Sequence, residues 1–265
     1  MKKNFRNLLV ISLIVAGCST VPMTGRKQLN IISNDEILAS SFQQYDEYIR
    51  TAPVSKDRQK TDLVIKVGKR IAAAVEQYMK NNGIEDQISD FKWEFHLVAD
   101  ATPNAFCMPG GKIVVYEGIL PYTQDETGLA VVLGHEVAHA VAKHSNERMS
   151  QQMVLSLGGE AVNIAVSKKS DMVKELAPAI YGLGSQYAIM LPYSRSHESE
   201  ADHMGLIFMA MAGYDPAMAE SFWLRMSQSG SKTPEFLSTH PSDQTRVSKI
   251  RSWLPEAKKY YRPTF

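Results

Sequence analysis

Two helices are predicted in the first third of the chain, because apolar residues recur there every three or four positions. The first begins after Ser33, which precedes acidic residues suited to the first turn of a helix. Its apolar face consists of Ile37, Leu38, Phe42, Tyr45 and Ile49. The second helix spans about residues 56–80 and is ended by Asn81-Asn82-Gly83.

A period of two follows, in which apolar residues occupy every second position. The alternating residues are Phe91, Trp93, Phe95 and Leu97. This pattern predicts a half-buried strand over residues 91–98. A second strand is predicted at 113–116, after a glycine-containing turn over residues 107–112. A small sheet therefore precedes the centre of the sequence.

The second half of the chain is predicted to be helical. A helix that opens near residue 123 carries apolar residues through residue 141 and is expected to be largely buried. Residues 153–192 are apolar but contain Pro178, several glycines and scattered polar residues. They favour a core helical hairpin or a mobile cover rather than a membrane span. Further helices are predicted at 194–211, after the turn at 213–216 up to residue 227, and at 242–253.

Composition is that of an ordinary globular protein. The chain has 265 residues, of which 44% are hydrophobic and 22% charged, and its formal net charge is +1. These values exclude a collagen-like, intrinsically disordered or disulfide-scaffold chain. The near-neutral charge gives no basis for a nucleic-acid partner. Of the two cysteines, Cys107 is expected to be a small apolar core residue.

The N-terminus has the form of a secretory signal. Basic residues precede a short apolar run at 8–15, about half of the ~20 residues that a membrane-spanning helix needs. The string Val15-Ala16-Gly17-Cys18 resembles a bacterial lipobox, in which cleavage precedes the cysteine and lipid attaches to it. We expect a signal peptide at 1–17 and a tether at 18–32 that is attached to a membrane through lipid on Cys18. A plain signal peptide is the alternative.

Residues 135–139 form an H-E-x-x-H string inside the apolar helix. His135 and His139 are four apart on one helical face, so that both imidazoles can bind one zinc ion, and Glu136 lies beside them. Zinc lowers the pKa of a water ligand towards ~7, and a neighbouring glutamate can take up its proton. Two satisfied core histidines and a surface glutamate are the alternative. Ala142 and Ser145 stand where the metzincin extension needs glycine and histidine, so a third ligand must come from elsewhere.

The segment 194–202 is the source that we expect for this third ligand. Glu198 and Asp202 are four residues apart on a predicted helix. One of them can bind the metal while the other accepts a hydrogen bond from a ligand imidazole.

These strings together resemble the zinc metallopeptidases of the CAAX prenyl protease and HtpX type, peptidase family M48. The likeness is greatest to small bacterial outer-membrane lipoproteins such as LoiP and to the catalytic domain of BepA. The likeness also extends to residues 21–29 and to residues 103–106 together with the Pro-Gly-Gly string at 109–111. The resemblance to Gram-negative lipoproteins favours a location at the outer membrane, facing the periplasm.

The family resemblance implies a zincin-like (gluzincin) α+β fold, mostly helical with a small mixed sheet, in a single domain over residues 33–265. It implies one Zn²⁺ per chain and Glu136 as the catalytic base. The implied metal ligands are His135, His139 and Glu198. Asp202 would orient a ligand imidazole. Glu200 is a competing ligand candidate, but the family has four residues from its glutamate ligand to its aspartate, and this spacing selects Glu198.

Two further residues follow from the same resemblance. His240, in a Thr-His-Pro string, would occupy the fourth position on the metal in a resting state, or would bond to the tetrahedral intermediate. Arg246, six residues later, would stabilise the oxyanion of that intermediate. A turn histidine and a surface arginine are the alternatives.

The function expected on these grounds is that of a zinc endopeptidase that cleaves unfolded or misassembled envelope proteins. We expect a peptide substrate to lie extended beside an edge strand that contains Asn104, Ala105 and Phe106. A chaperone-like assembly factor with a latent or structural zinc site is the alternative, and the outer-membrane assembly machinery would then be a partner.

Overall fold

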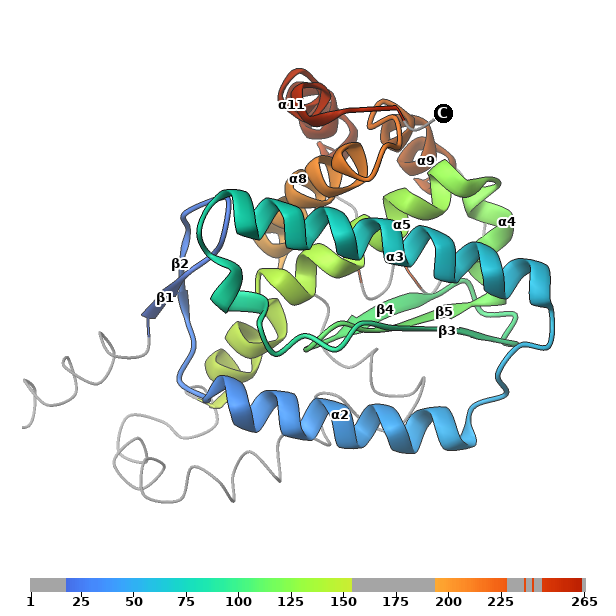
Figure 1. The fold of residues 1–265 in the computed structure, drawn as a ribbon. Helices are drawn as coiled ribbons and strands as arrows, with labels where there is room; N and C mark the ends of the chain where they lie inside the picture. The colour runs from blue at the N-terminus through green and yellow to red at the C-terminus, as the bar shows by residue number, and fades with distance from the viewer. Residues whose placement is uncertain (1–17, 154–193, 228–235, 237–239, 241–244, 264–265) are drawn as a thin grey trace, which may run out of the picture.

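The structure, a computed structural model, describes residues 18–153, 194–227, 236, 240 and 245–263 (Figure 1). The predicted signal peptide, most of the apolar segment at 153–192 and the polar loop at 228–234 lie outside the described residues. Among the residues that the structure describes, no helix has the length and apolar character needed to cross a membrane.

The two N-terminal helices form where the apolar pattern predicts them. Helix α2 spans Asn34–Thr51, and Ser33 caps it through a reciprocal pair of hydrogen bonds with Glu36. Helix α3 spans Arg58–Asn81, and the side chain of Asp57 accepts a hydrogen bond from the backbone N–H of Lys60. Each helix begins at a capping residue that bonds to a residue three positions later. The two helices predicted from the sequence are confirmed.

A small mixed sheet is formed by β3 (Glu94–Val98), β4 (Ala105–Met108) and β5 (Lys112–Tyr116). In the described part of the chain the strand order is β3-β5-β4, with β3 parallel and β4 antiparallel to β5. The predicted turn at 107–112 is shorter than expected, because its first two residues continue β4. Gly110 and Gly111 make the reversal with φ of +85° and +82°, values that glycine adopts without steric cost.

Helices lie against both faces of this sheet (Figure 1). Helix α2 packs on one face, where Tyr45 contacts Val114 and Tyr116. Helices α3 and α5 (Glu126–Val141) pack on the other face, so that every residue of β5 is buried. The mostly helical α+β fold with a small mixed sheet is therefore confirmed.

The C-terminal helices pack on the side of α5 that faces away from the sheet (Figure 1). Helices α8 (Arg195–Met211) and α9 (Met218–Ser227) contact α5, and α11 (Arg246–Tyr260) packs on α8 and α9. Short helices join the elements, namely η1 (Glu85–Ile88), η2 (Glu117–Ile119) and α4 (Leu120–Thr123). The last helix runs beyond the predicted end at residue 253 and continues past Pro255, because Ala257 still packs in the core.

Residues 18–32 differ from the expected tether. Strand β1 (Cys18–Thr20) pairs antiparallel with β2 (Lys27–Leu29). Between these strands, Val21 is 1% exposed and belongs to the main hydrophobic core. Burial of an apolar side chain contributes about 1.5–3 kcal/mol, which favours docking of the hairpin on the domain over a free segment.

Helices α5 and α8 cross at unusually short range. A Cβ atom on Gly205 would lie 2.9 Å from the backbone nitrogen of His135, and one on Gly134 would lie 2.9 Å from the carbonyl oxygen of Gly205. Backbone atoms cannot move aside as a flexible side chain can, so both positions require glycine. The crossing brings the H-E-x-x-H helix against the helix that carries Glu198.

We predict that Gly205→Ala forces the two helices apart. Such overpacking costs about 1–3 kcal/mol in the free energy of unfolding, and zinc affinity should fall with it because ligands from both helices separate. Denaturant unfolding and zinc titration measure the two effects. Ser199→Ala, a change elsewhere on α8, is the control and should stay within about 0.5 kcal/mol. Wild-type stability of Gly205→Ala would contradict the close crossing.

Candidate metal centre

Four predicted site residues converge in the interior of the domain. Helix α5 supplies His135 and His139, α8 supplies Glu198, and His240 comes from the C-terminal segment. One ligand atom from each lies within 4.8 Å of all the others, and all four residues are buried. Within the described residues, this is the one group of histidines, cysteines and acids with such geometry.

The spacing of these atoms fits a tetrahedral metal. Zn–N bonds of about 2.0–2.1 Å place neighbouring ligand atoms about 3.3 Å apart in a tetrahedron. His135 Nε2 lies 3.1 Å from His139 Nε2 and 3.4 Å from Glu198 Oε2, and His139 Nε2 lies 3.3 Å from Glu198 Oε1. His240 Nδ1 lies 3.2 Å from both His135 Nε2 and Glu198 Oε1. Two imidazoles and a carboxylate also suit zinc chemically, so the donor set fits this ion.

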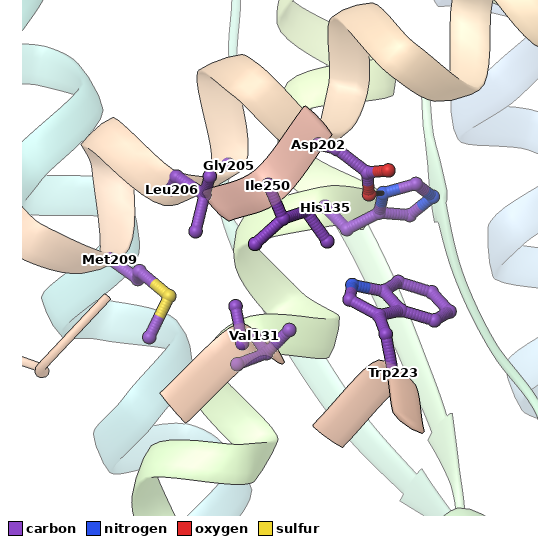
Figure 2. Close-up of a pocket in the computed structure, with 9 residues that line it drawn as sticks. Val131, His135, Asp202, Gly205, Leu206, Met209, Trp223 and Ile250 are labelled. Carbon is purple, nitrogen blue, oxygen red and sulfur yellow. Dashed lines mark hydrogen bonds and ion pairs between the residues drawn. The ribbon is translucent and has the colours of Figure 1, made fainter. Parts of the chain in front are cut away.

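His135 is held from the side opposite the cluster. Its Nδ1 lies 2.9 Å from the carboxylate of Asp202, and Figure 2 shows that carboxylate directed at the imidazole with Trp223 next to the ring. Behind the ring is a small pocket with apolar walls, formed in part by Leu206 and Ile250 (Figure 2). A carboxylate on the second nitrogen sets the tautomer and orientation of a metal-binding histidine.

Glu136 is 2% exposed and lies next to the cluster. Its Oε1 is 3.3 Å from His240 Nε2 but makes no hydrogen bond. Burial raises the pKa of the Glu136 carboxyl, although the charges of His240 and His135 partly offset this effect. A carboxylate with a raised pKa and an unoccupied oxygen is suited to accept a proton.

The charge of Glu198 is stabilised strongly. Burial disfavours its ionised form, but the charge of His240 and the hydrogen bond and charge of His135 hold the pKa of Glu198 well below its usual range. Glu198 is therefore a carboxylate, the form that binds a metal, at neutral pH.

His240 fills the fourth corner of the cluster. Its ring stacks on Phe236, which in turn stacks on Trp223. The backbone N–H of Phe236 donates to the carbonyl oxygen of Pro103 at 3.0 Å, and His240 N–H donates to Phe236 O at 2.9 Å. These contacts hold the ring between Glu136 and the other residues of the cluster. The role of His240 in a resting state stays a prediction.

Arg246 lies at the start of α11 and is 4% exposed, so it is no surface arginine. Its Nη2 donates to Asp202 Oδ1 at 2.7 Å, and its guanidinium lies 3.3 Å from the centre of the Trp223 ring. Its Nη1 is buried, makes no hydrogen bond and lies 3.5 Å from Glu198 Oε2. One donor of Arg246 therefore faces the cluster without a hydrogen-bond acceptor.

The predicted substrate edge lies beside the H-E-x-x-H helix. Strand β4 is an edge strand of the described sheet and packs on α5. Ala105 is buried and Phe106 is half-buried, with its ring directed at Tyr48 and Tyr116. Asn104 is buried, and its side-chain oxygen accepts from the N–H of Ala105 at 2.9 Å.

A second polar cluster adjoins the first and was not predicted. His144 Nδ1 lies 2.8 Å from His139 Nδ1, and His144 Nε2 lies 2.9 Å from Glu200. Burial lowers the pKa of His144 to about 4, so the ring is neutral at pH 7. Glu200, weighed as a metal ligand from the sequence, therefore belongs to this second cluster. The five-residue step from His139 to His144 does not match a helical repeat, so the sequence carries no signal for the contact.

Comparison with protein families identifies the family to which the chain belongs. The model of Peptidase family M48 matches residues 66–254, a range that includes all four cluster residues. The chain belongs to peptidase family M48. The expectation of a zinc metallopeptidase with one zinc ion per chain is confirmed, since the family and the donor set agree.

Several relatives of this M48 chain are metalloendopeptidases. The mitochondrial metalloendopeptidase OMA1 of Schizosaccharomyces pombe is 38% identical over 89% of the chain and 66% of its own length. That of Saccharomyces cerevisiae is 30% identical over 98% of the chain and 80% of its own length. The beta-barrel assembly-enhancing protease of Yersinia pestis is 26% identical over 96% of the chain and 53% of its own length. The chain thus spans only part of each relative.

These relatives contradict the expected location at a bacterial outer membrane. The two relatives with the higher identity are mitochondrial enzymes, whereas the bacterial protease is more distant. The expectation rested on the likeness of the N-terminus to a lipobox, and residues 1–17 lie outside the described structure. Cys18 is the first residue of β1, and its lipidation stays a prediction.

We predict that Glu147, which pairs with Arg26 in the second cluster, contributes stability that acid removes. Burial disfavours its charge, but hydrogen bonds from His197 and Arg26 lower its pKa from 4.5 to about 2. A depressed pKa gives stability that is complete above pH 4.5 and is lost as the pH falls towards 2. Glu147→Gln should therefore unfold at a lower temperature than wild type at pH 7, and the difference should shrink between pH 4.5 and 2.

Thermal unfolding at a series of pH values measures this difference. Glu47→Gln, on the exposed side of α2, is the control and should leave the melting temperature unchanged at every pH. A difference for Glu147→Gln that does not change with pH would contradict the ion pair.

Proposed function

We propose that this chain is an endopeptidase that cleaves unfolded or misassembled proteins and rests in a latent state. One observation carries the proposal: a buried carboxylate, Glu136, lies beside the metal cluster with an oxygen that makes no hydrogen bond. An unsatisfied buried oxygen is costly, and a structural zinc site has no need of one. Hydrolysis of a peptide bond needs a proton acceptor at this place.

Three residues hold the metal in this proposal, namely His135, His139 and Glu198. When bound, zinc polarises the scissile carbonyl and makes water a stronger nucleophile at neutral pH. The distances among the three ligand atoms, 3.1–3.4 Å, support this assignment. Asp202 keeps the proton of His135 on Nδ1, which leaves Nε2 for the metal.

The remaining steps fall to side chains next to these ligands. Glu136 takes a proton from the attacking water and passes it to the nitrogen of the leaving amine. Arg246 Nη1, a buried donor without a hydrogen-bond acceptor, supplies a hydrogen bond to the oxyanion that forms at the scissile carbon. Its second terminal nitrogen stays on Asp202, so the guanidinium is held in place while it acts.

Substrate binding beside β4 suits an unfolded protein. A peptide that adds to a sheet edge is held by backbone hydrogen bonds, which depend little on its side chains. Residues 104–106 provide this edge next to α5, which carries Glu136. Only an extended segment can pair in this way, and folded proteins expose few such segments.

Latency in this proposal comes from His240. Its Nδ1 occupies the fourth corner of the cluster, and its Nε2 faces Glu136 at 3.3 Å. The ring thus excludes water from the position where the nucleophile must sit. Phe236, which accepts from the backbone N–H of His240, bonds to the carbonyl oxygen of Pro103, the residue before Asn104. A substrate beside β4 would therefore lie next to the contacts that hold His240.

A second function is favoured by the same histidine. With His240 the cluster has four protein ligands, the number found in structural zinc sites. A chaperone-like assembly factor would need no more than such a closed site. The name of the Yersinia pestis relative, a beta-barrel assembly-enhancing protease, joins assembly and proteolysis in one protein.

We predict that Glu136→Gln lowers cleavage of casein, an unfolded protein, by about 10²–10⁴-fold. The side-chain amide of glutamine cannot accept the proton of the attacking water. Zinc content should match wild type, since Glu136 is not among the ligands. Glu47→Gln is the control and should cleave as wild type does. Cleavage by Glu136→Gln at the wild-type rate would overturn the proposed mechanism.

We predict that His240→Ala raises casein cleavage about tenfold, because the closed arrangement no longer competes with substrate. His203→Ala is the control, since His203 bonds to Glu256 outside the cluster. Loss of zinc from His240→Ala with no cleavage would instead favour the structural site of an assembly factor.

A further inference from the structure

A buried polar network connects the N-terminal hairpin with the metal ligand His139. It starts at Arg26, which precedes β2, and passes through Glu200 on α8 to His144. His144 begins the helix that follows α5 and is fully buried. The inference below rests on the proposed function only in that His139 binds the metal.

The direction of each hydrogen bond follows from this one assumption. A neutral imidazole that offers Nε2 to a metal carries its proton on Nδ1. His139 Nε2 faces the cluster, so His139 Nδ1–H donates to His144 Nδ1 at 2.8 Å. His144 therefore carries its own proton on Nε2 and donates it to Glu200 Oε2 at 2.9 Å.

Glu200 is held in place by the hairpin. Arg26 Nε donates to Glu200 Oε2 at 2.8 Å, and the hydroxyl of Thr24 donates to Oε1. Both carboxylate oxygens therefore bond to hairpin residues, and this fixes Oε2 in the position where it accepts from His144 Nε2.

Arg26 also binds a second carboxylate, Glu147, next to this network. Its two terminal nitrogens bind both oxygens of Glu147, at 3.0 and 2.7 Å. Glu147 accepts from His197 Nε2 at 2.9 Å, and the His197 ring stacks on His144 with centroids 4.4 Å apart. Only a planar, forked side chain can serve two carboxylates in this manner.

A break in the helix makes the contact with His139 feasible. Lys143 adopts a left-handed φ of +56°, which ends α5 and turns the chain so that His144 starts a new helix beneath His139. A lysine in this conformation is strained relative to one in the right-handed region, so the break must be held by the surrounding structure.

We propose that Arg26, Glu200 and His144 are positioning residues that fix the tautomer and orientation of His139, so that docking of the β1–β2 hairpin sets the metal affinity of the site. The Nδ1 of His135 bonds to Asp202, and the Nδ1 of His139 bonds to His144 of the hairpin network in the same way. Such partners change metal affinity by about 10–100-fold.

The test compares zinc affinity in the full chain by competition with a chelator, with the absorption spectrum of the Co²⁺-loaded chain as a second readout. His144→Leu removes the acceptor and should weaken zinc binding about 10–100-fold and alter the Co²⁺ bands. His144→Asn places an amide oxygen near the position of Nδ1 and should restore part of the affinity. Arg26→Lys keeps the charge but loses the fork, and should weaken zinc binding by a smaller factor.

His203→Asn is the matched control, because His203 Nε2 bonds to Glu256 at 2.8 Å in the same manner without reaching the cluster. It should leave zinc affinity and the Co²⁺ spectrum unchanged. Melting of the metal-free variants shows which of them fold. If His144→Leu does not fold, the zinc affinities and Co²⁺ spectra of Arg26→Lys and His144→Asn test the proposal in its place.

Zinc affinities of the folded variants within about twofold of wild type, with an unchanged Co²⁺ spectrum, would overturn the network's role. That result differs from failure of the proposed function. In the latter case the unaltered chain binds no zinc, or Glu136→Gln still cleaves casein, whatever the His144 variants do.

Discussion

The close contact between the backbones of α5 and α8 is the constraint on which the rest of the site depends. Gly134 and Gly205 meet at a distance that admits no Cβ atom. His135 follows Gly134 directly, and Glu198 and Asp202 lie about two turns and one turn, respectively, before Gly205 on the facing helix. The contact thereby places ligands from two helices around one point and buries them together.

Burial at this crossing explains why His135 and His139 have polar partners on the side away from the cluster. Polar and charged groups in an apolar interior are costly unless they are paired. Asp202 and Arg246 back His135, whereas His144, Glu200 and Arg26 back His139. Within the described residues, buried atoms next to the cluster that make no hydrogen bond include Glu136 Oε1, Glu198 Oε2, and Nε and Nη1 of Arg246. Such groups call for a functional explanation rather than a structural one.

Sequence patterns predicted those parts of the site that depend on local spacing. The cap at Ser33, the helical pair His135 and His139, and the pair Glu198 and Asp202 are all set by neighbours within four residues. Arg26 could not be predicted, since its partner Glu200 is 174 positions away. His144 was missed because a left-handed residue interrupts the helix before it. In the segment expected to be a tether the structure has a hairpin, whose buried Val21 and whose bonds from Thr24 and Arg26 to distant residues no local pattern predicts.

X-ray absorption at the zinc edge of the purified chain tests the central claim most directly, since it identifies the ligand atoms without a catalytic assay. We expect one zinc per chain with nitrogen and oxygen neighbours at about 2.0–2.1 Å, scattering from imidazole rings, and no sulfur. A sulfur neighbour at about 2.3 Å would contradict it, because the buried thiol of Cys107 would then be a ligand in place of the histidine and glutamate cluster.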